Sequence, residues 1–303
     1  MISDRIRQLY QRADRISGNR LNIVKDAIET FNITHANQAS AGLAYYLIFS
    51  LFPLLLVLIS AGSFFLSSEE VYLRVTQLVQ ENIPGSYEWL DENLRQILEQ
   101  RGAVGIIGIA TLLWAASGGF MSLAYNINLA WLEAPQRNFF QRRLIGLEMI
   151  AGLSGLFVLS LIVDSVINVL HILDLPLVAF LDLGLWKWIS NVFSWAVIFA
   201  LFFGLYYWVP TVNVRAKAAT SGALLSSISW KIATALFSLY IRSGFGRYEL
   251  VYGSLGALVA FLFLIYILAT ITLFGAHITS AIDRKLKLDQ ATGDATASED
   301  MKG

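Results

Sequence analysis

The 303-residue chain contains no cysteine, and this absence excludes several kinds of chemistry. It rules out disulfide bonds, thiolate metal sites, iron–sulfur clusters and a cysteine nucleophile. Charged residues make up only 15% of the chain, against about 25% in an average soluble domain. The net charge is zero, so no overall electrostatic attraction to nucleic acid is expected. Hydrophobic residues are instead abundant and gathered into long runs, as a membrane protein requires.

Sequence motifs for enzymatic chemistry are also scarce. The chain has only three histidines, His35, His171 and His277, and they lie in separate regions. It contains no HExxH, P-loop or GxSxG motif, and its carboxylates do not cluster as a metal-dependent nuclease requires. Basic residues interleaved with aromatic ones, as RNA binding needs, are missing from the polar segments. We therefore predict no enzymatic activity, no cofactor, no metal site and no nucleic-acid partner.

Six apolar runs are each long enough to cross a bilayer core as a helix, which takes roughly 20 residues. They cover approximately residues 39–66, 103–131, 144–170, 188–209, 218–240 and 254–282. The polar first 38 residues do not resemble a cleavable signal peptide, so the first run is expected to stay as a span. The sequence thus predicts an all-α, polytopic membrane protein whose six transmembrane helices form a membrane domain over residues 39–282.

Lysine and arginine are distributed unequally between the connecting segments, and this sets the expected orientation. The N-terminal segment, the second and fourth connections and the C-terminal tail together carry fifteen, against six on the opposite side. Because the side richer in basic residues faces the cytoplasm, both termini are predicted to be cytoplasmic. The expected location is the bacterial inner (plasma) membrane.

Three segments outside the predicted spans have recognisable character. Residues 1–38 form a basic arm that carries Leu21, Val24, Ile28 and Phe31 at helical spacing. Such a helix can lie along the inner leaflet or pack on the cytoplasmic ends of the bundle, and both placements stay open. Residues 67–102 predict a helical hairpin on the outer face, interrupted at Pro84 and Gly85. Residues 283–303 are polar and predict a disordered cytoplasmic tail.

Ionisable side chains inside predicted spans are costly in hydrocarbon, so each needs a partner or water. Lys231 lies about 13 residues into the fifth span, which at ~1.5 Å per residue places it roughly 20 Å from the cytoplasmic end. Asp164, in the outer part of the third span, is its expected partner. Two interpretations stay open: a buried Lys231–Asp164 pair that sets helix register, or a cation in a wet cavity that holds an anionic headgroup.

Two further features supply the remaining candidate residues for lipid binding and for a hinge. Pro53 removes a backbone hydrogen bond from the first span and predicts a kink. Such a kink can border a cavity or hinge, or arise from packing alone. The loop at residues 241–253 carries Arg242, Arg247 and Tyr252 at the predicted outer face. There the arginines can bind a lipid phosphate, and an ordinary interfacial loop is the alternative.

Several spaced motifs recur together over residues 20–285. The first two spans contain AYYLIFSLFP at residues 44–53, and WAASGGF at 114–120 followed by Leu123 and Asn128. The C-terminal half contains Gly222-Ala223, Trp230-Lys231, Tyr240, YGSLGA at 252–257 and LFGA at 273–276. This set resembles the YihY/BrkB family of bacterial inner-membrane proteins. The chain departs from the family pattern at His277, where an acidic residue is common, and at Phe263, where tryptophan is common.

The resemblance implies a six-helix inner-membrane protein connected with the cell envelope, for which movement of lipids or lipid-linked molecules has been suggested. An older label, ribonuclease BN, accompanies the family, and the residues of this chain give it no support. Our leading hypothesis is a transporter or flippase-like protein for an amphipathic anion, with lipid as substrate and Lys231 and Arg247 attracting the headgroup. The alternative is a non-catalytic scaffold that binds an envelope protein through the hairpin at residues 67–102.

Overall fold

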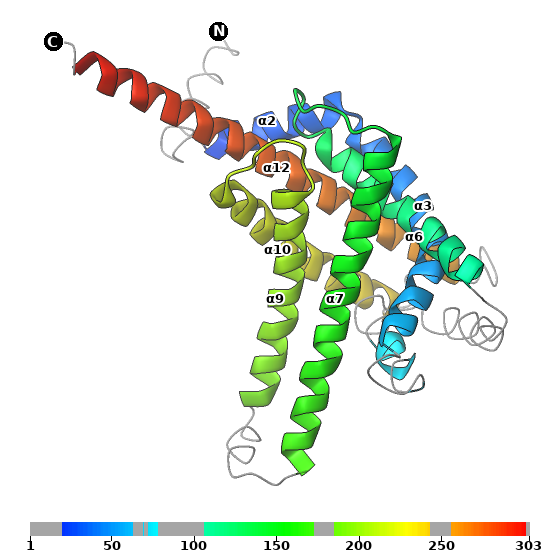
Figure 1. The fold of residues 1–303 in the computed structure, drawn as a ribbon. Coiled ribbons are helices and arrows are strands. Elements are labelled where there is room, and N and C mark those ends of the chain that lie inside the picture. Colours follow the sequence, from blue (N-terminus) through cyan, green and yellow to red (C-terminus); the bar gives the residue numbers. More distant parts are fainter. Residues whose placement is uncertain are drawn as a thin grey trace.

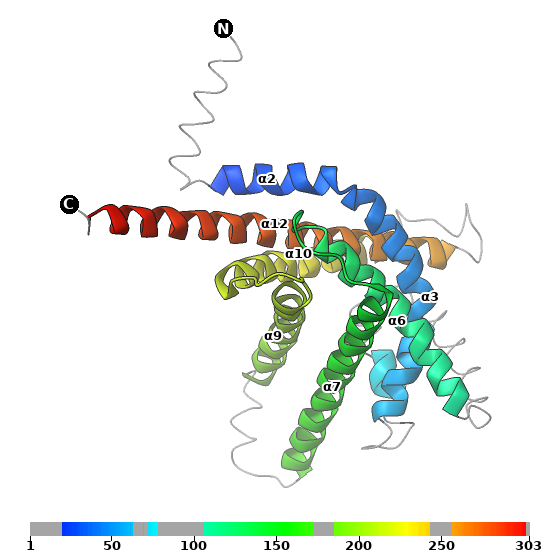
Figure 2. The same cartoon turned by 45° about the horizontal axis from the view of Figure 1, so that its top comes forward.

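The computed structural model describes residues 20–62, 69, 72–77, 106–172, 185–242 and 256–300. Its helices are α2 (Arg20–Ile33), α3 (Ala36–Gly62), α6 (Ile106–Asn128), α7 (Phe139–Ile172), α9 (Leu185–Trp208), α10 (Ala216–Arg242) and α12 (Gly256–Asp300). Regular secondary structure in these residues is entirely α-helical, which confirms the all-α prediction for this part of the chain. In Figures 1 and 2, α12 crosses the bundle and its C-terminal end projects beyond the other helices.

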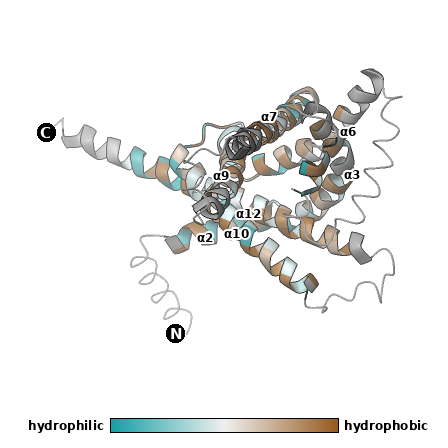
Figure 3. Cartoon of the chain, turned by 90° about the horizontal axis from the view of Figure 1, so that it is seen from below, coloured by the Kyte–Doolittle hydropathy of each residue, from teal (hydrophilic) through white to brown (hydrophobic). Residues whose placement is uncertain are grey.

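Within the described residues, each of the six predicted apolar runs overlaps one helix, from α3 to α12. Within the described residues, α10 over Ala216–Ile241 and α12 over Val259–Thr292 are long and apolar enough to cross a bilayer. Hydrophobic residues recur along the helices, as the colouring of the cartoon in Figure 3 shows, and some of them are exposed. On α10, for example, Ile232, Leu236 and Leu239 lie on one face and are all more than half exposed. A continuous exposed face of this kind is suited to lipid rather than water.

The amphipathic helix α2 packs along α12, as Figure 2 shows. Ala27 is fully buried against Ile278 and Ala281, and the ring of Phe31 meets that of Phe274 edge-on at 5.7 Å. Packing on the bundle is therefore the placement that the structure shows for residues 20–33. The other predicted apolar positions on α2 remain exposed and are Leu21, Val24 and Ile28. The packed face therefore includes only Phe31 of the four predicted apolar positions, together with the small residue Ala27.

The predicted disordered tail is corrected over residues 283–300, where α12 continues as helix. Tertiary contacts stabilise the first turns of this extension. Arg284 Nη2 lies 2.7 Å from Asp26 Oδ2 of α2, and Leu286 packs partly buried against the main core cluster. Because an existing helix gains one hydrogen bond for each residue added, these anchors allow α12 to extend into a polar segment.

Glycine permits the close approach of α10 and α12. A Cβ on Gly275 would overlap Ser226 Oγ and Tyr206 OH, and would lie 3.0 Å from Tyr206 Cζ. The Tyr206 hydroxyl is fully buried, lies 2.7 Å from Ser226 Oγ and donates to the carbonyl oxygen of Thr272 at 2.8 Å. This network joins α9, α10 and α12 in the core. Small residues serve this purpose in membrane bundles because they let helix backbones approach closely.

The side chain of Asp283, on α12, binds the backbone at the start of α10. Its side chain is fully buried, and Oδ1 accepts a hydrogen bond from the Arg215 backbone N–H at 3.0 Å. Oδ2 forms an ion pair with Lys287 Nζ at 2.7 Å, without the geometry of a directed hydrogen bond. The Lys287 side chain is 46% exposed, so solvent weakens this pair and the backbone contact matters more.

We expect Asp283→Ala to lower the free energy of unfolding by about 1–3 kcal/mol, because it leaves the Arg215 N–H without its acceptor. Thermal unfolding of the purified protein in detergent measures the change. Asp289→Ala is the matched control, because Asp289 lies on the same helix but is exposed. Equal melting temperatures for the two variants would contradict the role of Asp283.

Candidate functional site

An apolar cavity of about 540 Å³ lies within the bundle, and α3, α6, α7, α9, α10 and α12 all contribute to its wall. Much of the wall comes from α7 and α9, including Met149, Leu153, Leu156, Leu201, Leu205 and Trp208. The volume falls within the range of about 300–1,000 Å³ that is usual for ligand pockets. Because the lining is predominantly hydrocarbon, the cavity is suited to an apolar group such as an acyl chain.

Few polar groups reach this cavity, and two of them are hydrogen-bonded within their own helices. The hydroxyls of Ser50 and Thr272 donate to carbonyl oxygens of their own helices, at 3.2 and 2.8 Å. Glu148 of α7 is also among the lining residues. Burial lowers the pKa of Arg137, in the loop before α7, and the negative charge of Glu148 partly opposes this shift. Glu148 is therefore a residue of the cavity wall whose charge also acts on Arg137, in the loop between α6 and α7.

Lys231 does not line the cavity, although the adjacent Trp230 does. Its Nζ donates a hydrogen bond to Ser194 Oγ of α9 at 3.2 Å, and the side chain is half-buried. Asp164 is on α7, and its side chain falls outside the described residues. The predicted Lys231–Asp164 pair therefore stays a prediction.

The other predicted site residues are placed only in part. Pro53 lies inside α3, one residue before Leu54 of the cavity wall, so the expected kink position borders the cavity. Arg242 is the last residue of α10, and its side chain lies outside the described residues, as do Arg247 and Tyr252 entirely. Most of the hairpin predicted at 67–102 also lies outside them.

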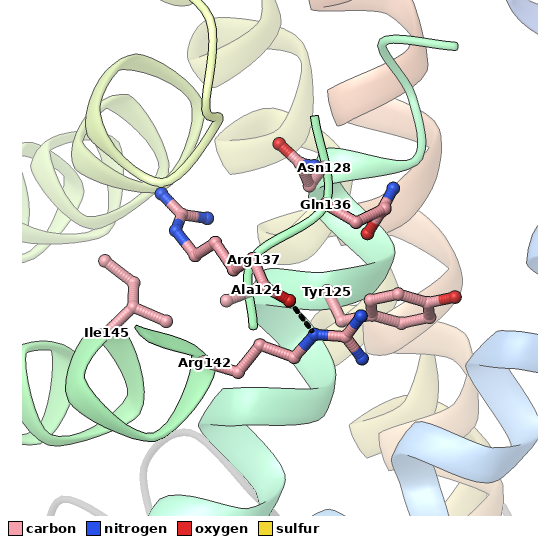
Figure 4. Close-up of a pocket in the computed structure, with 7 residues that line it drawn as sticks. All are labelled: Ala124, Tyr125, Asn128, Gln136, Arg137, Arg142 and Ile145. Atoms are coloured by element: carbon pink, nitrogen blue, oxygen red, sulfur yellow. Dashed lines mark hydrogen bonds between the residues drawn. The ribbon is translucent and has the colours of Figure 1, made fainter. Parts of the chain in front are cut away.

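A small polar pocket lies between α6 and the start of α7 (Figure 4). Its polar lining comes from Tyr125, Asn128, Gln136, Arg137 and Arg142, and its volume of about 10 Å³ is enough for one water-sized group. Arg142 Nε donates to the carbonyl oxygen of Arg137 at 2.9 Å, and the Arg142 guanidinium lies 4.3 Å from the Tyr125 ring centroid. In the sequence, these arginines contribute only to the lysine and arginine count that predicts membrane orientation, and no motif there indicates the pocket.

Asn128, which belongs to the second-span motif, positions the loop around this pocket. Its buried amide Oδ1 accepts hydrogen bonds from the Thr211 backbone N–H at 2.8 Å and hydroxyl at 2.9 Å. Its Nδ2 donates to the carbonyl oxygen of Pro135 at 3.2 Å. Asn138 and Gln141 then form a reciprocal capping box that starts α7. The connections α6–α7 and α9–α10 are thus held together at one end of the bundle.

His277 is buried, and its ring lies between α2 and α12. Its Nδ1 lies 3.2 Å from Thr30 Oγ1 and its Nε2 lies 3.3 Å from Thr34 Oγ1. Hydroxyls can donate or accept, so both nitrogens of a neutral imidazole are satisfied. His277 thus belongs to the packing of α2 rather than to the cavity wall.

Comparison with known proteins places this architecture in a family. The chain matches the virulence factor BrkB family over residues 27–300. It belongs to this family. The BrkB-family chain is 26% identical to the ribonuclease-like protein YfkH of Bacillus subtilis, over 88% of this chain and 98% of that protein. It is 27% identical to the UPF0761 membrane protein VV0203 of Vibrio vulnificus, over 93% of this chain and 88% of that protein. No solved structure matches.

The membrane character of the BrkB-family chain follows from two observations together. Relatives such as VV0203 are named membrane proteins, and the structure contains helices long and apolar enough to cross a bilayer. The prediction of an integral membrane protein is confirmed at this level. No group of three or more histidine or acidic residues placed to hold a metal ion occurs in the part of the chain that the structure describes.

Proposed function

We propose that this BrkB-family protein is a transporter or flippase-like protein of the inner membrane that moves an amphipathic anion, with lipid as its substrate. The observation that supports the proposal is the apolar cavity of about 540 Å³ among six helices. An acyl chain would replace empty volume next to side chains such as Leu153 and Leu205 and would gain favourable apolar contact there. The headgroup would require polar or charged groups near the end of that cavity.

The proposal includes six spans with both termini in the cytoplasm. The distribution of lysine and arginine supports this orientation. The connections α6–α7 and α9–α10, together with α2, would then lie on the cytoplasmic side. A chain in the cavity could keep its headgroup near these connections while α7 and α9 enclose its hydrocarbon part.

Lipid movement in reconstituted vesicles tests this function. Fluorescent phosphatidylglycerol is incorporated in both leaflets, and a membrane-impermeant quencher reports how much of it reaches the outer leaflet. Vesicles with the purified protein should expose inner-leaflet lipid that protein-free vesicles protect. Identical quenching with and without protein would contradict the proposal and favour the scaffold function predicted for residues 67–102.

Lys231 gives a separate prediction in the same assay. We expect Lys231→Ala to slow movement of the anionic lipid several-fold, because it removes a half-buried cation next to the cavity residue Trp230. Ser194→Ala is the matched control, because it removes the hydrogen-bond partner and keeps the charge. Wild-type rates for Lys231→Ala would remove Lys231 from the mechanism without affecting the role of the cavity.

A further inference from the structure

We propose that helix α2 lies in the headgroup region of the inner leaflet and binds an anionic phospholipid surface. In this arrangement Leu21, Val24 and Ile28 insert among acyl chains, and the basic sequence at the N-terminus contacts the headgroups. The inference goes beyond lipid movement and does not require it. It takes from the proposed function only the cytoplasmic placement of the N-terminus.

The apolar residues of α2 extend beyond the side that contacts α12. Ala27 is fully buried in that contact. Leu21, Val24 and Ile28 follow one another at spacings of three and four positions, so they form a single stripe along the helix. Ile28 directly follows Ala27 and therefore lies about 100° further around the helix axis, on the flank of the contact. The three side chains are 38%, 43% and 47% exposed, so the protein covers only part of the apolar surface of α2.

The side of α2 opposite the contact is polar. Lys25 and Glu29 lie two positions from Ala27 in either direction, hence about 200° away from it, and both are exposed. The helix thus has one side on the bundle, an apolar flank and a polar side away from the bundle. A helix that lies in the surface of a bilayer beside a bundle needs this arrangement, with acyl chains at the flank and water at the polar side.

The short connection to α3 places α2 close to the membrane surface. Thr34 and His35 alone separate α2 from α3, which contains the first predicted span. Two residues reach only about 7 Å, so α2 ends close to the point where this span begins. His35 has a φ of 52°, in the left-handed region in which helices commonly end, and Figure 2 shows the chain turning sharply there. Helix α2 therefore runs across the direction of α3 rather than continuing it.

The contact with α12 indicates the same level in the membrane. Helix α2 packs on Ile278 and Ala281, and Asp26 pairs with Arg284 at 2.7 Å. At this point the apolar sequence of α12 ends, and three basic residues follow, Arg284, Lys285 and Lys287. Basic residues concentrated at the end of a span are typical of the cytoplasmic headgroup region.

The charge of the sequence before and at the start of α2 suits an anionic surface. Residues 1–20 contain two aspartates, Asp4 and Asp14, and five arginines, Arg5, Arg7, Arg12, Arg15 and Arg20. Each basic residue held near anionic headgroups adds to the attraction. A second copy of the chain matches this surface less well, because it would bring a second set of the same positive charges. Three partly exposed side chains also offer far less than the area of about 800 Å² per partner that a standard protein interface buries.

Single spin labels measure where the apolar flank lies. The chain contains no cysteine, so Val24→Cys and Ile28→Cys each carry one label in the full-length protein. In vesicles of phosphatidylcholine and phosphatidylglycerol, collisions of the label with oxygen, which concentrates in hydrocarbon, are compared with collisions with a water-soluble nickel chelate. Glu29→Cys is the matched control, because Glu29 is also exposed on α2. We expect a nickel-to-oxygen collision ratio several-fold lower for Val24→Cys and Ile28→Cys than for Glu29→Cys.

Lipid composition tests the role of the basic sequence. In vesicles of phosphatidylcholine alone, the collision ratio for Ile28→Cys should rise several-fold, because anionic headgroups are absent. Replacement of the five arginines of residues 1–20 by glutamine should give the same rise in vesicles that contain phosphatidylglycerol. An unchanged ratio in either experiment would overturn the role of anionic headgroups.

Two other results would overturn the placement of the flank in lipid. One is an equal collision ratio at all three labelled positions. The other is protection of Val24→Cys and Ile28→Cys from both reagents together with spin–spin broadening between molecules, because a second copy would then cover the flank. None of these measurements depends on lipid movement. A protein that moves no lipid but shows the expected ratios would contradict the proposed function and leave this inference supported.

Discussion

Filling the cavity at Gly152 is expected to abolish lipid movement, while the same substitution at Gly155 leaves it close to wild type. Gly152 lines the cavity, and a Cβ added there meets nothing within 4 Å. A phenylalanine at this position can therefore be accommodated, with its ring projecting into space that an acyl chain would use. Because the ring would occupy this space, an acyl chain should no longer fit in the cavity.

Gly155→Phe is a closely matched control for this prediction. Gly155 lies one turn further along α7, also has nothing within 4 Å of an added Cβ, and is not part of the cavity wall. Gly152→Phe and Gly155→Phe therefore have matched effects on helix propensity and exposed apolar area. The vesicle assay and lipid retention in detergent measure the outcome. Equal transport and equal retention by the two variants would contradict a role for the cavity.

The second large effect is expected for Gly275→Ala in the contact between α10 and α12. The added methyl group would overlap Ser226 Oγ and Tyr206 OH. The fully buried tyrosine ring would have to move, and its hydroxyl would lose the acceptor at Thr272. Overpacking costs about 1–3 kcal/mol and loss of a buried hydrogen bond about 1–3 kcal/mol more. We therefore expect a strongly lowered melting temperature and poor recovery of monodisperse protein.

Gly42→Ala is the matched substitution for this experiment. Gly42 lies on α3, and a Cβ added there meets nothing within 4 Å. Replacing glycine by alanine inside a helix otherwise stabilises it by roughly 0.5–1 kcal/mol, so Gly42→Ala should be neutral or slightly stabilising. A Gly275→Ala protein that melts with the wild type would show that the interface can relax at no cost.

Local features of the chain were predictable from sequence because their causes are local. Each of the six apolar runs could be recognised because a membrane-crossing helix needs about 20 consecutive apolar residues. Over the residues that the structure describes, each run overlaps a helix, and the spaced motifs correctly indicated the BrkB family. The tail was mispredicted because composition does not reveal that Arg284 meets Asp26 and that Leu286 joins the core.

The candidate site was much less predictable. Lys231 drew attention because a cation in an apolar run is costly, but helix rotation places its Nζ beside Ser194 and outside the cavity wall. Glu148 and Arg137 received no site role, because eleven positions and a helix start separate them along the chain. Their electrostatic interaction depends on how the loop before α7 folds back, which the Asn128 contacts control.

The sequence by itself determined an all-helical membrane protein, its apolar segments and its family, because these depend on hydropathy and motif spacing along the chain. Only the tertiary structure decided where the cavity lies, which face of α2 packs, and that two arginines share a pocket near Glu148. Those features depend on the rotation and separation of helices. Close contacts between distant residues, such as Gly275 with Tyr206, set that rotation and separation, and no local pattern encodes them.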